Sequence, residues 1–400
     1  MQKSLKFNLS LLSLLLTGGA LLQSAPVQAT DDWHWHGFVS QGVMQAKDSN
    51  FLNNDGDVSF ALTEVGLNSV WQLDSDIRVA GQLMYLDGGN RFQPGLRIDY
   101  LFLNWTVLNT LDWQLDVTAG RFKNKHWLYS STRDVALTRP MIVLPQSVYF
   151  DSFRDIAVGS DGLALQSTYS NSLGELELNW SLGSTQLPKE QSQRIISIFV
   201  TGASRQKFVH QLSTFFRPAG AKSQWGISLL DSDFSYRKST ADIFADGDFT
   251  VQRVMLNWRY NAEDWELSSE VFQERVSVYG FNAPGFQRTQ FAQGAYLLGR
   301  YNVTEKTSLF ISYDHYFSNK DDRDGSDLPL LSGGQVADYF GYQRDTGVAL
   351  SHDLAKNWRV TLEYHWTTGT GRLGPNVVPD IQVNKSKHHQ LWAAQLMYWF

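Results

Sequence analysis

From Trp33 to the end of the chain, two-faced segments follow one another, with apolar residues alternating with polar or small ones over about 10 to 14 residues. In WRVTLEYHW, residues 358–366, Leu362 and Tyr364 fall on one face of a strand, whereas Arg359 and Glu363 fall on the other. A charged face cannot form the core of a β-sandwich. These segments therefore need an apolar environment on one side and water on the other.

The connections between these segments alternate in length. Seven short ones lie at residues 74–76, 109–112, 171–174, 218–223, 261–264, 304–306 and 353–357, and eight longer ones begin near residues 47, 88, 125, 186, 239, 280, 319 and 371. Transmembrane barrels have short periplasmic turns and long outer loops, a rhythm that a sandwich does not need. The pattern predicts an all-β, antiparallel transmembrane barrel of about sixteen strands, with both termini on the periplasmic side. A barrel this wide leaves an aqueous channel.

The first 29 residues have the features of a secretory signal peptide. Lys3 and Lys6 precede an apolar stretch from Leu9 to about Leu22, and small residues lead to Ala29, after which we expect cleavage. The alternative is a membrane anchor, but the apolar stretch is interrupted and falls short of the roughly 20 residues that span a bilayer. The sequence therefore predicts a signal peptide at residues 1–29 and a barrel domain at residues 30–400.

Charge and composition exclude some classes of function. Cleavage would remove two of the 34 basic side chains. The mature chain would then have 32 basic and 40 acidic side chains, a net charge of −8. This balance gives no electrostatic footprint for nucleic acid, and in a channel it favours at most a slight preference for cations. Cysteine is absent, so disulfides do not contribute to stability.

The last ten residues, LWAAQLMYWF, alternate in the same way and end in phenylalanine. This strand resembles the insertion signal of Gram-negative porins, with Tyr398 and Phe400 in the aromatic girdle at the periplasmic end. The resemblance implies insertion by the outer-membrane barrel assembly machinery. It also implies contact with outer-membrane lipid and lipopolysaccharide, association as a homotrimer, and a channel for small hydrophilic solutes.

The longest loop runs from about Lys125 to Asp161. It resembles the third loop of trimeric porins, which folds into the channel and narrows it, and the preceding AGRFKN resembles the strand that enters this loop in phosphate-selective porins and related uncharacterised porins. The basic ladder of that group cannot be matched here, so no binding site is carried over. The apolar run PMIVLPQSVYF, residues 140–150, needs burial and is expected to pack the loop against the barrel interior.

Charges of both signs in this loop are candidates for a pore constriction, where opposed charges set up a transverse field. The candidates are Lys125, Arg133, Asp134, Arg139, Asp151, Arg154 and Asp155. If the three arginines line the constriction, changing them to alanine shifts selectivity toward cations. The alternative is that these charges are solvated or hold the loop against the wall.

Further charges fall on the inward faces of the predicted strands and are candidate pore-lining residues: Arg78, Arg97, Asp99, Arg253, Arg259, Glu266, Glu270, Arg300, Asp314, Arg359 and Glu363. The two signs are mixed and no single-sign ladder emerges. The strand charges therefore leave the ion selectivity open.

Catalytic and metal-binding patterns are weak. The chain contains no nucleophile-elbow motif and no phosphate-cradling loop, and barrel hydrolases that pair a histidine with an aspartate resemble narrower barrels. His34 and His36 share one face of the first strand, but no cysteine or firm carboxylate completes a metal site with them or with His388 and His389. We expect a porin without enzyme activity, cofactor or metal. The alternatives are an adhesin or receptor acting through the outer loops and, less favoured, a barrel hydrolase.

Overall fold

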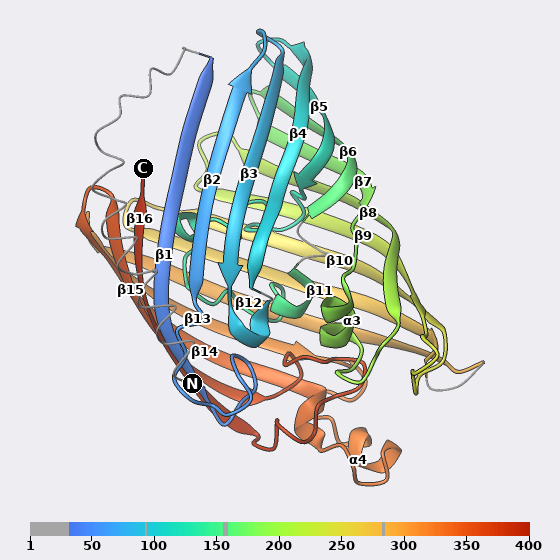
Figure 1. Cartoon of the computed structure of the whole chain (residues 1–400). Helices are drawn as coiled ribbons and strands as arrows, with labels where there is room; N and C mark the ends of the chain where they lie inside the picture. Colours follow the sequence, from blue (N-terminus) through green and yellow to red (C-terminus); the bar gives the residue numbers. More distant parts are fainter. Residues whose placement is uncertain (1–31, 93, 155–158, 282–284) are drawn as a thin grey trace.

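The computed structural model describes residues 32–92, 94–154, 159–281 and 285–400. The predicted signal peptide and Asp155 lie outside these residues. In the described part, sixteen antiparallel strands form one closed barrel (Figure 1). The strands are β1 (Trp33–Lys47), β2 (Thr63–Gln72), β3 (Ile77–Asp87), β4 (Gly95–Asn109), β5 (Trp113–Lys123), β6 (Gly159–Asn171), β7 (Gly174–Ser184), β8 (Ala203–Pro218), β9 (Ser223–Arg237), β10 (Gly247–Asn261), β11 (Trp265–Gly280), β12 (Gln287–Thr304), β13 (Thr307–Phe317), β14 (Tyr342–Ala355), β15 (Trp358–Gly369) and β16 (His388–Trp399). The predicted fold class and strand count are confirmed.

Each strand pairs with its neighbours in the chain, and β1 pairs with β16 to close the barrel. The closing register runs from Phe38 opposite Trp399 to Lys47 opposite Gln390. Phe400 extends this ladder, because its backbone N–H donates to the Gly37 carbonyl at 3.0 Å and its carbonyl accepts from the Gly37 N–H at 3.1 Å. Closure leaves no sheet edge with unpaired backbone groups, which a hydrocarbon environment would penalise.

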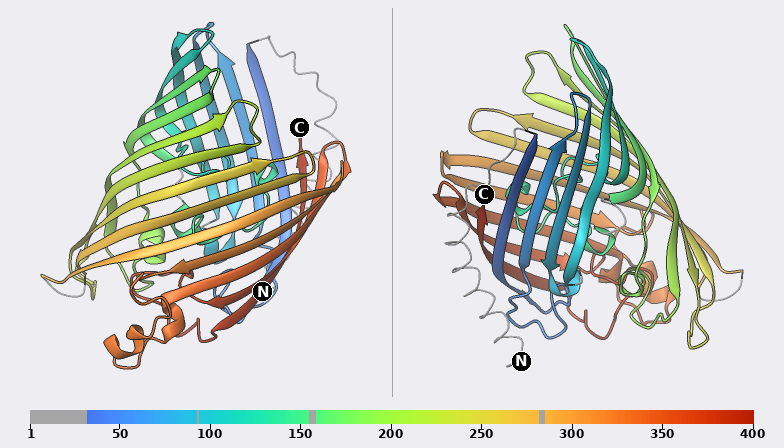
Figure 2. Two further views of the ribbon diagram at one scale, coloured as in Figure 1. Left: turned by 180° about the vertical axis from the view of Figure 1, so that it is seen from behind. Right: turned by 45° about the horizontal axis from the view of Figure 1, so that its top comes forward.

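Short turns join the strands at one end of the barrel and longer loops join them at the other. Helix α3 (Lys189–Ile195) lies in the fourth loop, and helix α4 (Asp327–Leu331) lies in the seventh loop. Figure 2 shows the tilted strands from two further sides. Neither helix of the described residues is long and apolar enough to cross a membrane.

Most of the outer surface of the barrel is apolar, as the alternation predicts. On β15, Leu362 and Trp366 point outward and are each 49% exposed, whereas Glu363 and His365 point inward and are each 4% exposed. A bilayer requires apolar side chains on the outside of the barrel, and it requires that the backbone N–H and C=O groups of the strands be paired within the closed sheet. The outer surface therefore suits a barrel that lies in a membrane.

Aromatic rings gather on the outer surface near the short turns. Trp265 of β11 lies 4.6 Å from Tyr301 of β12, measured between ring centroids, and Trp225 lies 5.9 Å from Trp258. Such rings suit the headgroup region of a membrane, where one side of the ring is apolar and the other is wet. They mark the turn end of the barrel as one membrane interface.

Candidate functional site

The third loop, between β5 and β6, lies inside the barrel and is the candidate functional site. Its apolar side chains Met141, Ile142, Leu144 and Tyr149 are buried. Met141 and Leu144 pack with wall residues of β10 to β14, while Ile142 packs with residues of β1 and β16. The loop therefore packs on two neighbouring parts of the wall, as its apolar run requires.

Carboxylates on the wall fix the backbone of the loop. Glu363 of β15 accepts hydrogen bonds from the backbone N–H groups of Ile142 at 2.6 Å and Val143 at 2.9 Å. Asp314 of β13 accepts from the N–H of Ser147 at 3.0 Å. These acceptors satisfy loop N–H groups that would otherwise be buried without a partner. Two of the predicted pore-lining acids therefore support the loop.

Glu270 of β11 supports the loop in the same way. Its carboxylate accepts a hydrogen bond from the N–H of Leu128 at 2.9 Å and others from the hydroxyls of Tyr149 and Tyr296. The Glu270 side chain is fully buried. Burial of this charge is tolerable because three donors surround it.

Four of the charges predicted for the constriction, Arg133, Asp134, Asp151 and Arg154, belong to two buried groups of ion pairs. In the first group, Asp134 contacts both Lys123 and Arg154, and Lys123 also contacts Asp99 of β4. Asp99 is buried and lies at the point where the pairing of β3 with β4 shifts register. Burial opposes ionisation of Asp134, but Arg154 and Lys123 outweigh it and hold its pKa well below the ordinary value.

In the second group, Asp151 contacts Arg133 of the same loop and Arg91 of the second loop, the latter at 2.6 Å. Burial opposes ionisation of Asp151, yet Arg91 and Arg133 lower its pKa below the ordinary value. Arg139 forms a bidentate pair with Glu64 of β2, which is 1% exposed. These placements correspond to the alternative in which the charges hold the loop against the wall.

Other candidate residues lie elsewhere in the lumen or at its rim. Lys125 is exposed, and its ammonium group donates to Gln166 at 2.7 Å. Arg78 donates to Asn104 at 3.1 Å, and Arg97 is partly buried on the inner side of β4. Among the described residues, Lys125 and Arg78 do not contact the two groups of ion pairs at the third loop.

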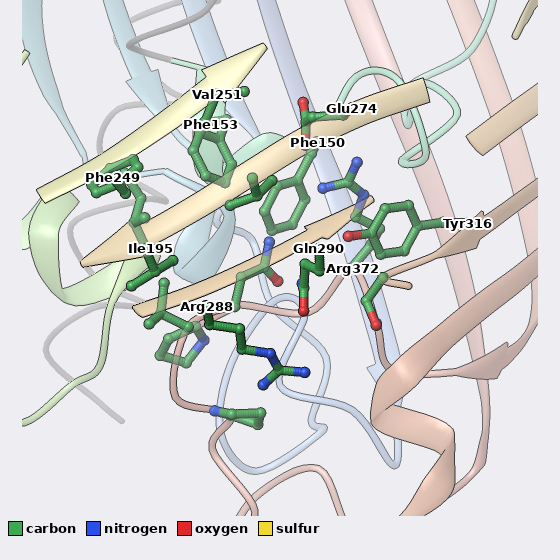
Figure 3. A pocket seen from close by; sticks show the side chains of 18 of the residues that line it. Phe150, Phe153, Ile195, Phe249, Val251, Glu274, Arg288, Gln290, Tyr316 and Arg372 are labelled. Carbon is green, nitrogen blue, oxygen red and sulfur yellow. The ribbon is translucent and has the colours of Figure 1, made fainter. Parts of the chain in front are cut away.

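Two cavities lie on opposite sides of the third loop. The turn-end cavity has a volume of about 370 Å³. Its charged lining consists of Arg139, Arg259, Glu266, Arg300, Glu305, Lys306, Asp353 and Arg359. The loop-end cavity has a volume of about 360 Å³, lies under the fourth, seventh and eighth loops, and is lined mainly by aromatic and aliphatic side chains (Figure 3). The third loop therefore separates two environments of different polarity.

Sequence reasoning missed several residues that complete this site. They are Glu64, Arg91, Lys123, His126 and Arg372. Strand alternation could not place Arg91, His126 or Arg372, because each lies in a loop, and Glu64 and Lys123 lie at strand ends. A buried ionisable residue in a loop has no local pattern that predicts its partner.

The inward-facing histidine of β15, His365, is held by two carboxylates. His365 contacts Asp345 through Nδ1 at 2.6 Å and Glu363 through Nε2 at 2.7 Å. Both ring nitrogens are therefore engaged, whereas a general base needs one nitrogen directed at a nucleophile. The cluster supports the loop through Glu363 and lacks the geometry of a serine-histidine pair.

Comparison with solved structures identifies the fold. The in-vitro folded OmpT of Vibrio cholerae superposes with a TM-score of 0.57 and 11% identity over 94% of this chain and 100% of that chain. OprB of Pseudomonas putida at high pH superposes with a TM-score of 0.56 and 10% identity, over 92% of this chain and 94% of that chain. The anion-selective porin of Comamonas acidovorans superposes with a TM-score of 0.55 and 11% identity, over 92% of this chain and 99% of that chain.

No protein-family model matches the sequence, and neither does any curated protein. At identities this low, the likeness establishes the fold alone. That fold is the 16-stranded barrel of outer-membrane porins.

Proposed function

We propose, with the porin fold as the premise, that this protein is a water-filled channel through which small hydrophilic solutes and ions cross the outer membrane by passive diffusion. The observation that carries this proposal is the third loop, which is tied across the lumen and leaves a cavity on each side. In the proposed channel, a loop fixed in this way restricts the size and charge of what passes.

The proposal involves no covalent chemistry. The inward-facing carboxylates that could act as acids or bases contact loop N–H groups, tyrosines, arginines or His365. A role as adhesin or receptor would depend on the exposed loops, and no contact within the described loops favours it over transport.

The outer surface supports the proposal that the barrels associate as trimers. Arg121 of β5 and Asp161 of β6 form a bidentate pair, with Nε–Oδ1 and Nη2–Oδ2 distances of 2.7 and 2.8 Å, on the outward side of the sheet. Their side chains are 40% and 44% exposed. Charges on a lipid-facing surface are unfavourable, so a neighbouring barrel would shield this pair better than lipid does. Native mass spectrometry in several mild detergents should detect trimers, and a monomer in all of them would contradict the proposal.

Planar bilayer recording tests the channel directly. Purified mature protein, refolded in detergent, should produce stepwise conductance increments, whereas the same sample denatured by heat should produce none. Absence of increments from folded protein would contradict the channel and favour the receptor role. Hydrolysis of lipid or peptide by that sample would favour the hydrolase.

A further inference from the structure

The loop-end cavity has an unexpected lining for a passage that only serves hydrophilic solutes. Phe234, Phe249, Val251 and Val278 lie along its wall on β9, β10 and β11, and Phe150 of the third loop lies at its floor. These are inward-facing positions, where a wide barrel ordinarily presents polar groups to water. The volume of about 360 Å³ is within the usual range for small-molecule sites, roughly 300 to 1,000 Å³.

One end of this cavity contains a buried arginine from the eighth loop. Arg372 is 3% exposed, and its guanidinium lies 3.7 Å from the centroid of Tyr316 and 4.9 Å from that of Phe150. Figure 3 shows Arg372, Tyr316 and Glu274 toward one side of the pocket and Phe249 and Ile195 toward the other. The cavity thus has a cationic end and an apolar end.

Arg372 has no carboxylate partner within ion-pair distance among the described residues. Its Nη2 donates to the Ser147 carbonyl at 2.8 Å, while its Nε is buried without a hydrogen-bond partner. The two acids that act on it electrostatically are already engaged, Glu274 with Arg253 and Asp314 with the N–H of Ser147. A buried cation with an unused donor is costly unless an acceptor or an anion reaches it.

The other charged groups of the cavity leave it positive. Arg253 and Glu274 neutralise each other, and Arg288 of β12 is exposed and forms no ion pair in the part of the chain that the structure describes. Arginine suits carboxylate binding because its planar fork can donate two parallel hydrogen bonds. Phosphate would also satisfy the charge, but a fully polar anion would gain nothing from the aromatic and aliphatic wall.

We infer that the loop-end cavity binds a small carboxylate with an apolar body, such as an aromatic acid, before it passes the third loop. The carboxylate accepts hydrogen bonds from Arg372, and the apolar body packs against Phe249 and Val251 across the cavity. This inference rests on the proposed channel function for its role in transport. Binding itself can be measured independently of conductance.

Isothermal titration calorimetry of detergent-refolded protein at low salt tests the inference, with benzoate as the probe. Benzamide, which has the ring without the charge, and acetate, which has the charge without the ring, should each bind at least about tenfold more weakly than benzoate. Equal binding of benzoate and benzamide, or no binding of benzoate, would overturn the inference.

Two variants address the residues separately. Arg372→Gln should weaken benzoate binding at least about tenfold through loss of the charged donor, and Val251→Asp should weaken it similarly through repulsion of the carboxylate. If Arg372→Gln fails to fold, the benzoate affinity of Val251→Asp tests the site on its own. The control is Arg217→Gln, which removes an exposed arginine paired with Glu175 outside the cavity and should leave binding unchanged. Wild-type affinity in both cavity variants would refute the site.

Bilayer recording of the same samples separates this inference from the proposed function. Conductance without benzoate binding would refute only the inference, whereas benzoate binding without conductance would refute only the channel.

Discussion

Buried ionisable side chains determine where the third loop lies. Asp134 and Asp151 each contact two basic residues, and each is less than 9% exposed. Buried ion pairs contribute modestly to net stability, because desolvation offsets their attraction, but removal of one partner leaves an uncompensated buried charge. At the residue scale these pairs therefore specify the position of the loop more than they stabilise the barrel.

Replacement of Asp134 by alanine should show the cost of leaving a buried charge without its partner. The change removes the carboxylate that both Lys123 and Arg154 contact, and we expect it to lower the free energy of unfolding by about 3–5 kcal/mol. Arg217→Ala, in the exposed pair with Glu175, should cost about 1 kcal/mol or less. Urea unfolding in detergent measures both, and similar losses for the two variants would contradict the prediction.

His126 should make the protein less stable in acid. It is 1% exposed in the third loop, and burial, assisted by the charge of Arg253, lowers its pKa to about 3. The unfolded chain, with a histidine pKa of about 6.5, therefore binds more protons between these values. The contribution of His126 to the free energy of unfolding is therefore constant above about pH 6.5. Between about pH 6.5 and pH 3 the free energy of unfolding falls by up to roughly 1.4 kcal/mol per pH unit.

Thermal unfolding at pH 7 and pH 4.5 measures this effect. His126→Leu should show a smaller decrease in melting temperature between the two pH values than the wild type. The control His388→Gln, at an exposed histidine, should behave as the wild type does. Equal decreases in all three proteins would refute the role of His126.

Two elements have roles beyond the strand ladder: the third loop and the last strand. The loop segment 141–147 depends on acceptors from β13 and β15, although these lie far away in the sequence. The last strand closes the barrel, and its final ring packs so tightly on Gly37 that a Cβ atom there would lie 2.4 Å from Phe400 Cζ. Both elements therefore depend on contacts made only when the barrel is complete.

Glu363→Gln should loosen the third loop locally. An amide can replace only one of the two carboxylate acceptors and adds donors facing the N–H groups, so the segment loses charge-assisted hydrogen bonds worth about 1.5–3 kcal/mol each. Hydrogen exchange of the Ile142 and Val143 amides should accelerate. The control Glu177→Gln, on the wall near Lys125, should leave these amides protected, and unchanged exchange in Glu363→Gln would contradict the prediction.

Deletion of Phe400 should impair assembly more than function. The deletion removes two backbone hydrogen bonds that close the barrel and a terminal aromatic ring next to Tyr398. The yield of folded barrel in the outer membrane should fall, whereas the conductance of the barrels that do assemble should match the wild type. Phe400→Tyr, which keeps the ring, should assemble normally. A normal yield from the deletion would refute a role in assembly.

At the scale of the whole molecule, the lumen differs in charge from the complete chain. The mature chain would be acidic, which at the sequence level favoured a slight cation preference. The turn-end cavity, however, is lined by five basic and three acidic side chains, and the loop-end cavity by Arg253, Arg288, Arg372 and Glu274. The electric field in a confined lumen depends on the charged side chains that line it more than on the net charge of the whole chain.

The channel should therefore prefer anions. Reversal potentials in a potassium chloride gradient at low salt, where screening is weak, measure this preference. Arg300→Glu, in the turn-end cavity, should shift selectivity toward cations, while Arg217→Glu at the exposed rim should have little effect. Cation preference in the wild type would contradict the prediction.

Local patterns in the sequence were enough to predict the barrel, its sixteen strands, the positions of its turns and loops, and the outward face of each strand in which apolar and polar residues alternate. Alternation and turn composition report the local environment of each segment, so neighbouring residues are enough to predict these features. Two features could be learned only from the folded barrel: which carboxylate accepts a hydrogen bond from which loop N–H, and which arginine has no carboxylate partner among the described residues. Glu363 is 221 residues from Ile142, and Arg372 is 225 residues from Ser147. Such contacts depend on how the closed barrel brings distant residues together, and no local pattern records that geometry.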